Sequence, residues 1–195
     1  RSERPGAVRR RSRDRIQRHS RGADIDKTSK SSLGCPFDCG LCENHKSSTI
    51  LGNIDVTNRC NLSCPVCFAD AGDATNEPTM AQIELMMQVL RDQEPAPCPA
   101  VQFSGGEPTI RADLPDIIAL AKRMGFAQVQ MATDGLMLAS RPDLCEKLIK
   151  SGLYTVCLQF DGVTPQPYEA MRGRNVLPEK LRAIENLRQV GNLSI

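Results

Sequence analysis

The stretch from Thr57 to Asp70, TNRCNLSCPVCFAD, constrains this chain more than any other. Its cysteines Cys60, Cys64 and Cys67 form a CxxxCxxC pattern directly after the strand-like run at 54–56. Three thiolates on so short a loop can converge on one soft metal centre, and cysteine is the preferred ligand of iron–sulfur clusters. Three is one fewer than the irons of a cubane cluster. An iron without a protein ligand can bind a small molecule, so the spacing indicates chemistry rather than electron storage alone.

A second CxxxCxxC pattern, formed by Cys35, Cys39 and Cys42, precedes the first. Nine cysteines could form a secreted disulfide scaffold or bind metal inside a cell. The repeated spacing, the odd total and the lack of a signal-peptide core favour reduced thiols that bind metal. We assign no metal role to the other cysteines, because buried cysteine is commonly just a small apolar residue. These are Cys98, Cys145 and Cys157.

Composition divides the chain into three parts. Residues 1–26 form an Arg-rich tail, followed by a Cys-rich segment at 27–50 and a globular domain at 51–195. Residues 1–22 carry nine Arg against two acidic residues, a net charge of +7, which leaves −5 for the rest of a chain whose formal charge is +2. This charge suits nucleic acid or an anionic membrane. The tail has almost no apolar residues to bury, so we expect it to be disordered and solvated.

The amino-acid composition of the whole chain is that of a soluble globular protein. Of the 195 residues, 40% are hydrophobic and 25% are charged. No apolar run approaches the roughly 20 residues that span a bilayer, and we expect a cytoplasmic location. A body with 4% aromatic residues and net negative charge offers no obvious groove for specific nucleic-acid binding. The chain begins with Arg rather than Met, which indicates a fragment or a non-native upstream sequence.

From residue 51 onward, strand patterns alternate with helical patterns. Strands are predicted at 51–57, 100–104, 127–132 and 153–160, and helices at 79–93, 112–124, 142–150 and 178–190. Thr79 and Gln82 predict a capping box at the first helix. Successive βα units imply an α/β fold with a parallel sheet, and the motif loops then follow strand carboxyl ends, where such folds bind ligands. The chain ends where a fifth strand would begin.

Two motifs at strand ends give the chain a specific resemblance. CNLSCPVC follows the first strand and GGEP follows the second, and together they resemble the radical S-adenosylmethionine (radical SAM) superfamily over residues 51–190. The resemblance implies a partial (β/α)6 barrel, C-terminally incomplete, with about four of its βα units present. It implies that Cys60, Cys64 and Cys67 hold a [4Fe–4S] cluster whose fourth iron binds SAM. One electron then cleaves SAM, and the 5′-deoxyadenosyl radical abstracts a substrate hydrogen in a shielded cavity.

The resemblance also implies which residues bind SAM. Gly105, Gly106 and Glu107 correspond to the segment that binds its amino group, the glycines by close backbone approach and the carboxylate by pairing with the ammonium. Val66 stands where the family usually has an aromatic residue near the adenine, and Phe68 could supply that bulk. Later strand ends carry polar residues that contact SAM or substrate in the family, or that serve ordinary turns. These are Thr133, Gln159 and Asp161.

The upstream segment GCPFDCGLCENHK narrows the resemblance. It is similar to the radical SAM group that contains the dihydropterin methyltransferases and the archaeal tetraether lipid synthases. That similarity implies an auxiliary iron–sulfur cluster held by Cys35, Cys39 and Cys42. Ile50 replaces a further cysteine of the group, so either His45 is the fourth ligand or the iron is open to substrate.

The resemblance implies methylation or C–C coupling at an unactivated carbon of a pterin- or lipid-type substrate. The electron donor would be a ferredoxin or a flavodoxin. One alternative is a peptide- or cofactor-maturing radical SAM enzyme, whose auxiliary clusters more often lie C-terminal to the barrel. Another is a non-catalytic iron–sulfur electron-transfer module, which GGEP and the βα units disfavour because a carrier needs neither. With part of the barrel missing, we expect weak or no turnover from this chain alone.

Overall fold

The structure is a computed structural model that describes residues 48–195 except 68, 73–76, 95 and 192. The Arg-rich tail and most of the Cys-rich segment lie outside the described residues. The auxiliary cluster predicted at Cys35, Cys39 and Cys42 therefore stays a prediction, as do the roles considered for His45 and Phe68.

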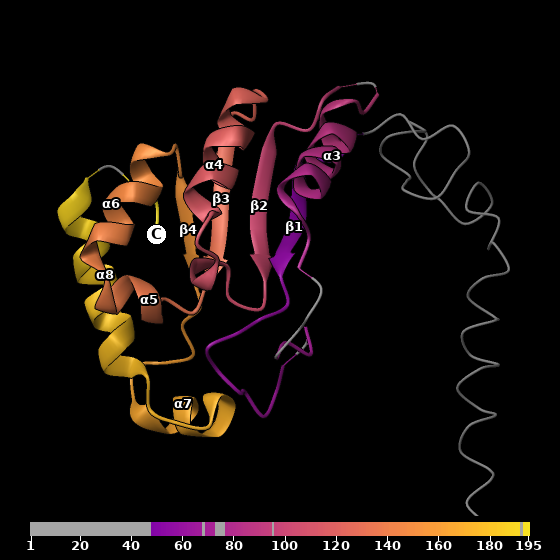
Figure 1. Cartoon of the computed structure of the whole chain (residues 1–195). Coiled ribbons are helices and arrows are strands. Elements are labelled where there is room, and N and C mark those ends of the chain that lie inside the picture. Colours follow the sequence, from indigo (N-terminus) through magenta and orange to yellow (C-terminus); the bar gives the residue numbers. More distant parts are fainter. Residues whose placement is uncertain (1–47, 68, 73–76, 95, 192) are drawn as a thin grey trace, which may run out of the picture. The chain divides into compact units, whose positions relative to one another are not determined.

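Four parallel strands form one sheet in the order β1-β2-β3-β4 (Figure 1). They are β1 (Leu51–Thr57), β2 (Ala100–Gly105), β3 (Gln128–Thr133) and β4 (Thr155–Leu158). Each crossover advances in the same direction, as in a β/α barrel and unlike a doubly wound sheet, whose order reverses. A parallel bridge between Thr155 and Ser194 continues the order beyond β4. The carboxyl ends of all four strands therefore share one edge.

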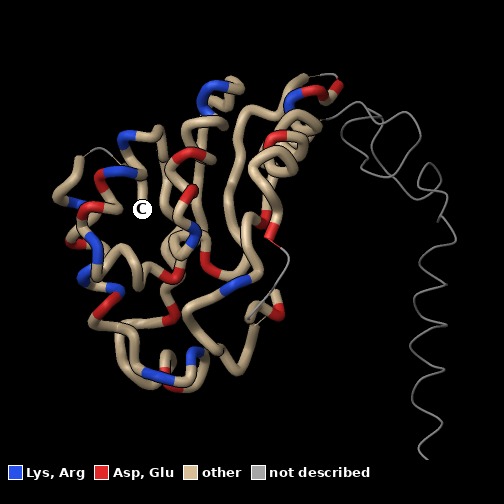
Figure 2. Tube along the Cα trace, viewed as in Figure 1, with Lys and Arg blue, Asp and Glu red and all other residues tan. Residues whose placement is uncertain are grey.

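Four longer helices pack on one face of this sheet. They are α3 (Met80–Arg91), α4 (Leu114–Arg123), α6 (Pro142–Lys150) and α8 (Leu177–Val190). Strand residues such as Val101, Phe103 and Met131 share a fully buried core with Ile117 and Ile83 from the helices. Burial of this apolar layer is the main favourable contribution to folding. Basic and acidic residues are interspersed along the described chain (Figure 2), and none of its helices is long and apolar enough to cross a membrane.

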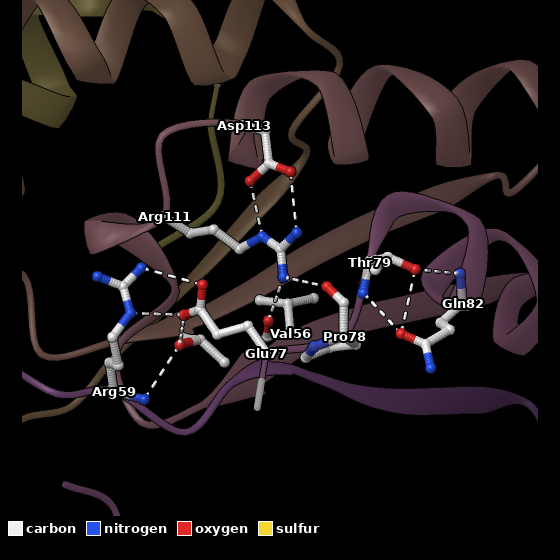
Figure 3. Close-up of polar contacts among 9 residues, drawn as sticks. Val56, Arg59, Glu77, Pro78, Thr79, Gln82, Arg111 and Asp113 are labelled. Atoms are coloured by element: carbon white, nitrogen blue, oxygen red, sulfur yellow. Dashed lines mark hydrogen bonds and ion pairs between the residues drawn. The ribbon is translucent and has the colours of Figure 1, made fainter. Parts of the chain in front are cut away.

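The sequence patterns predicted these elements well. Each predicted strand and helix is confirmed, with both ends within two residues of the prediction. The capping box at α3 is also confirmed: the Thr79 N–H donates to Gln82 Oε1 at 2.8 Å, and the Gln82 N–H donates to Thr79 Oγ1 at 3.3 Å (Figure 3). The predicted α/β fold with a partial barrel order is therefore correct.

Three short helical elements were not predicted. They are η1 (Pro108–Ile110), α5 (Leu136–Ser140) and α7 (Pro165–Arg172). The α5 sequence, LMLAS, is too short and too uniformly apolar to show a helical period. The α7 sequence, PQPYEAMR, resembles a turn, although Pro165 suits a first helical position, where an N–H has no helical partner. Tyr168 fixes α7 because it is fully buried and its hydroxyl donates to Gly162 O at 2.8 Å.

Arg111 joins three segments of the chain: the end of β1, the start of α3 and the start of α4 (Figure 3). Its Nη1 donates to Val56 O at 2.6 Å and to Pro78 O at 2.8 Å, while Nε and Nη2 donate to the Asp113 carboxylate at 2.6 and 2.9 Å. The Arg111 side chain is 7% exposed, and its hydrogen bonds lower the pKa of Asp113. Arg111 therefore ties the starts of α3 and α4 to β1.

We expect Arg111→Lys to lower the free energy of unfolding by about 2–3 kcal/mol, because one ammonium cannot replace a fork that serves three groups. The matched control is Arg141→Lys, which changes a 46% exposed arginine that pairs with exposed Asp143. This control should cost less than about 0.5 kcal/mol. Urea unfolding measures both values. Equal losses would show that Arg111 contributes no more than a surface ion pair.

Candidate functional site

The cysteine loop leaves β1 through an anchored segment (Figure 3). The Thr57 hydroxyl donates to Glu77 Oε1 and accepts the Arg59 N–H at 3.0 Å. The Arg59 guanidinium donates to the two Glu77 oxygens at 2.7 and 3.1 Å, and this interaction lowers the pKa of Glu77. These contacts hold the residue before Cys60 at the sheet edge.

The turn Gly105-Gly106-Glu107 binds the same segment through the main chain. The Gly106 N–H donates to Thr57 O and the Glu107 N–H donates to Arg59 O, both at 2.8 Å. A Cβ on Gly105 would lie 2.1 Å from Thr57 O, and one on Gly106 would lie 2.1 Å from Arg59 O. Gly105 also has a φ of 124°, which favours glycine. The glycines thus permit close approach to the cysteine loop itself, and their predicted approach to the SAM amino group stays a prediction.

One pocket collects residues from both motifs. Its lining includes Cys60, Cys64, Cys67, Glu107, Thr133, Asp134, Gln159 and Arg172. Cys60 and Cys64 are half-buried and Cys67 is exposed. Among the described residues, no three His, Cys, Asp or Glu side chains converge as a formed metal site. The motif thiols share a pocket without closing on one centre, and metal loops of this kind commonly take their final geometry from the metal.

Glu107 links the ends of β2 and β3. Its Oε1 accepts the Thr109 N–H at 3.0 Å, the Thr109 hydroxyl, and the Thr133 hydroxyl at 2.7 Å, while Oε2 accepts the Asp134 N–H at 2.7 Å. Burial, followed by the charge of Asp134, raises the pKa of Glu107 to about 7. With a single donor on Oε2, this oxygen can accept another hydrogen bond. Its predicted pairing with an ammonium is therefore chemically feasible and stays a prediction.

Two buried polar atoms in the pocket residues have no partner among the described residues: Asp134 Oδ2 and Gln159 Nε2. Lys180, fully buried on α8, donates to Asp134 O and, at 2.8 Å, to Gln159 Oε1. Burial raises the pKa of Asp134 and lowers that of Lys180. An unpaired buried polar atom is costly, so a ligand with a donor for Asp134 and an acceptor for Gln159 would be stabilising. The ammonium and carboxylate of an amino acid such as SAM fit this pair.

Asp161 has a different environment from the other predicted SAM contacts. It accepts two hydrogen bonds from Arg172, at 2.7 and 2.8 Å, and this pairing lowers the pKa of Asp161. The Arg172 Nη1 lies 3.7 Å from Cys64 Sγ. Asp161 is absent from the residues that line the pocket in the described chain. It orients Arg172 beside the cysteine loop, and its predicted contact with SAM or substrate stays a prediction.

Sequence reasoning missed Asp134, Lys180 and Arg172. Asp134 stands in a Thr-Asp-Gly turn, for which ordinary turn chemistry is a sufficient explanation. Lys180 and Arg172 reach the strand ends from α8 and α7, and helical periodicity does not reveal such contacts. A lysine on the buried side of a predicted helix is the signal that could have found Lys180.

The three remaining cysteines differ in burial. Cys98 and Cys145 are buried, whereas Cys157 is exposed. Alternate residues of β4 face away from the helices, and Cys157 is one of them. The absence of a metal role for these three cysteines stays a prediction.

Comparisons with known proteins identify the family. Residues 54–194 match the radical SAM superfamily. The chain is 56% identical over 160 residues to a 7,8-dihydro-6-hydroxymethylpterin dimethyltransferase of Methanocaldococcus jannaschii, which covers 81% of this chain and 31% of the relative. It is 32% identical over 139 residues to a probable GTP 3′,8-cyclase of Sulfolobus acidocaldarius, which covers 71% of this chain and 42% of the relative. The chain thus spans less than half the length of these relatives.

Solved structures with the same fold agree with this match. Methylornithine synthase has a TM-score of 0.60 and 17% identity, and the alignment covers 75% of this chain and 43% of that enzyme. SuiB of Streptococcus suis, bound to its precursor peptide, has a TM-score of 0.61 and 20% identity over 75% of this chain and 32% of SuiB. At these identities the likeness concerns the fold alone. Together, the family match, the sheet order and the motifs at the strand ends show that this chain belongs to the radical SAM superfamily.

Proposed function

We propose that this chain forms the cluster- and SAM-binding part of a radical SAM enzyme that methylates a pterin. The observation that carries the proposal is one pocket whose lining brings three cysteines together with the GGEP turn. The lining residues also include two buried polar atoms that have no partner within the described residues. The 56% identity with the archaeal pterin dimethyltransferase supports the substrate. The chain spans 31% of that relative, so the activity is proposed for the whole protein.

In this proposal, Cys60, Cys64 and Cys67 are the cluster ligands. A [4Fe–4S] cluster with SAM bound supplies 5′-deoxyadenosyl radical chemistry. Burial, followed by the carboxylates of Asp134 and Glu107, raises the pKa of Cys60. Positive charge is therefore needed to hold this thiolate, and iron provides it.

The proposed amino-acid subsite of SAM lies at the ends of β2, β3 and β4. Glu107 Oε2 and Asp134 Oδ2 are acceptors for its ammonium, and Gln159 Nε2 is a donor for its carboxylate. Lys180 donates to Asp134 O and to Gln159 Oε1, and these hydrogen bonds position both residues. The Asp161–Arg172 pair is 12% and 17% exposed, and it directs a cation toward the cysteine loop without titrating near neutral pH.

The remaining features of the whole protein follow from this chemistry. An auxiliary iron–sulfur cluster held by Cys35, Cys39 and Cys42 is proposed for the whole protein. A ferredoxin or flavodoxin would reduce the radical SAM cluster, and the cytoplasm would keep the thiols reduced. A lipid-type substrate with C–C coupling is the alternative activity.

Anaerobic reconstitution of the protein that contains this chain tests the proposal. With dithionite as the electron source, one SAM as the radical source and a second SAM as the methyl donor, 7,8-dihydro-6-hydroxymethylpterin should yield a methylated pterin together with 5′-deoxyadenosine, methionine and S-adenosylhomocysteine. Cys60→Ala should abolish these products. Formation of 5′-deoxyadenosine without a methylated pterin would refute pterin methylation. Bound zinc with no SAM cleavage would instead indicate a non-catalytic metal module. Cys39→Ser should lower the iron content and leave SAM cleavage in place. This result would distinguish the role of the auxiliary cluster from that of the radical SAM cluster.

We expect Gly106→Ala to reduce the iron and sulfide retained after reconstitution severalfold. Its Cβ would lie 2.1 Å from Arg59 O and would displace the main chain next to Cys60. Gly72→Ala is the matched control in the same loop, since a Cβ there meets no described atom within 4 Å. Iron and sulfide analysis with circular dichroism distinguishes cluster loss from unfolding. Full cluster content in Gly106→Ala would show that this close approach is unimportant for the cysteine loop.

The affinity for SAM should depend on pH through Glu107. Its carboxyl has a pKa of about 7, so it becomes neutral as the pH falls and can no longer pair with an ammonium. The affinity should therefore decrease by up to about tenfold per unit below that pKa. Glu107→Gln should bind SAM weakly and without this dependence, whereas the exposed control Glu84→Gln should behave as wild type. Calorimetric titration of the cluster-loaded protein between about pH 5.5 and 7.5 measures the trend, and a flat wild-type profile would contradict it.

A further inference from the structure

The sheet has a polar face opposite its helices. Along the strands, buried apolar residues face the helices, and most of the residues between them are polar and at least partly exposed in the described chain. The apolar residues on that same side are Leu51, Ala100 and Ala132. Parallel strands are usually apolar on both sides, because helices or other strands cover both faces. We call the uncovered side the polar face. Its members, as the name is used here, are the six residues near the middle and carboxyl ends of the strands that carry a polar or thiol group: Asn53, Asp55, Gln102, Ser104, Gln130 and Cys157.

Hydrogen bonds join the β1 and β2 members of the polar face. Asp55 Oδ1 accepts from the Ser104 hydroxyl and, at 3.3 Å, from Asn53 Nδ2. Gln102 Nε2 donates to Asn53 Oδ1 at 3.3 Å. Both bonds to Asp55 end on Oδ1, which leaves Oδ2 as an acceptor within the described part of the chain.

The same network continues across β3 and β4. The Cys157 thiol lies 3.4 Å from Gln102 Oε1 and 3.7 Å from Gln130 Oε1. The strand register places Asn53 beside Gln102 and Gln102 beside Gln130, so the amides form a row across the sheet. This row offers amide donors and acceptors on one face of the sheet.

The polar face adjoins the pocket that contains the three motif cysteines and the proposed SAM subsite, which we call the SAM pocket. Ser104 belongs to the polar face and also lines the pocket, next to Gly105. The hydroxyl of Ser104 contacts Asp55, one strand over. A ring that rests on the polar face would therefore lie beside the proposed radical source.

The chemistry of the polar face discriminates among substrate classes. Asp55 is its one charged member, and none of its six members is Lys or Arg. A lipid chain would leave these donors and acceptors without partners, which is unfavourable. A triphosphate would meet a carboxylate and no cation. A neutral heterocycle with adjacent N–H groups and a carbonyl matches a carboxylate flanked by amides.

We propose that the polar face binds the pterin ring, with Asp55 accepting hydrogen bonds from its 2-amino and ring N–H groups. Gln102 and Gln130 provide amides for the rest of the ring edge. This inference rests on the proposed function and identifies Asp55 as the residue that selects a pterin over a lipid or a nucleoside triphosphate.

Asp55→Asn tests the inference because it keeps the side-chain size but replaces an acceptor by a donor. We expect the Kd for 7,8-dihydro-6-hydroxymethylpterin to rise about 10- to 100-fold, measured by pterin fluorescence with the cluster-loaded full-length protein. Asp116→Asn, an exposed change on α4, is the matched control and should leave the Kd unaltered.

Alkylation of Cys157 gives an independent measurement. The thiol is exposed on the polar face, so the pterin should slow its reaction with iodoacetamide, followed by peptide mass spectrometry. GTP and oleate should give no protection. Protection by oleate but not by the pterin would overturn the inference in favour of a lipid.

The outcomes separate this inference from the proposed function. Wild-type methylation of the pterin together with normal pterin binding by Asp55→Asn would overturn the inference alone. Wild-type cleavage of SAM with neither pterin binding nor pterin methylation would overturn both. Weaker pterin binding in Asp55→Asn, with Cys157 protected in the wild type, would support the inference.

Discussion

Two main-chain hydrogen bonds hold the site together. They run from the Gly106 N–H to Thr57 O and from the Glu107 N–H to Arg59 O. Through them the end of β2 fixes the position at which the cysteine loop leaves β1. The approach is so close that a side chain at either glycine would overlap a carbonyl oxygen. The glycine turn therefore has a structural role that is independent of any cofactor.

The pocket next to these two hydrogen bonds is lined partly by buried polar side chains. Glu107 and Asp134 are buried just after the ends of β2 and β3, and Lys180 of α8 is buried against Asp134. Glu107 accepts from four donors in the described part of the chain, where Asp134 and Gln159 each retain an atom without a partner. A site that served folding alone would replace such atoms with apolar groups, since unpaired buried polarity reduces stability. Here the unpaired polar atoms belong to residues that line the pocket where the two motifs meet. A local loss of stability of this kind is typical of a ligand site.

Much of this arrangement could be predicted from the sequence because its determinants are local. Apolar periodicity located every long strand and helix, and the two motifs indicated the sheet edge because carboxyl ends of parallel strands meet there. Lys180 and Arg172 could not be predicted, because their contacts depend on how α8 and α7 pack. The final geometry of the motif thiols also could not be predicted from the sequence, because the loops of metal sites commonly take their geometry from the metal. The polar face was visible as alternation within strands such as VQFS and VQMA, although it was not used.

The alternation of apolar and polar residues along the strands assigns core packing to one face of the sheet and the proposed recognition of the substrate to the other. Consecutive strand residues point to opposite faces, so Phe103 packs in the core while its neighbours Gln102 and Ser104 lie on the polar face. A substitution on the polar face can change what is recognised without opening a cavity in the core. The strand ends, by contrast, combine the glycine junction with the positions proposed for the cluster and SAM, so one change there would affect all three. A fold organised in this way can retain one radical chemistry while its substrates differ, because specificity is carried by side chains that the core does not require.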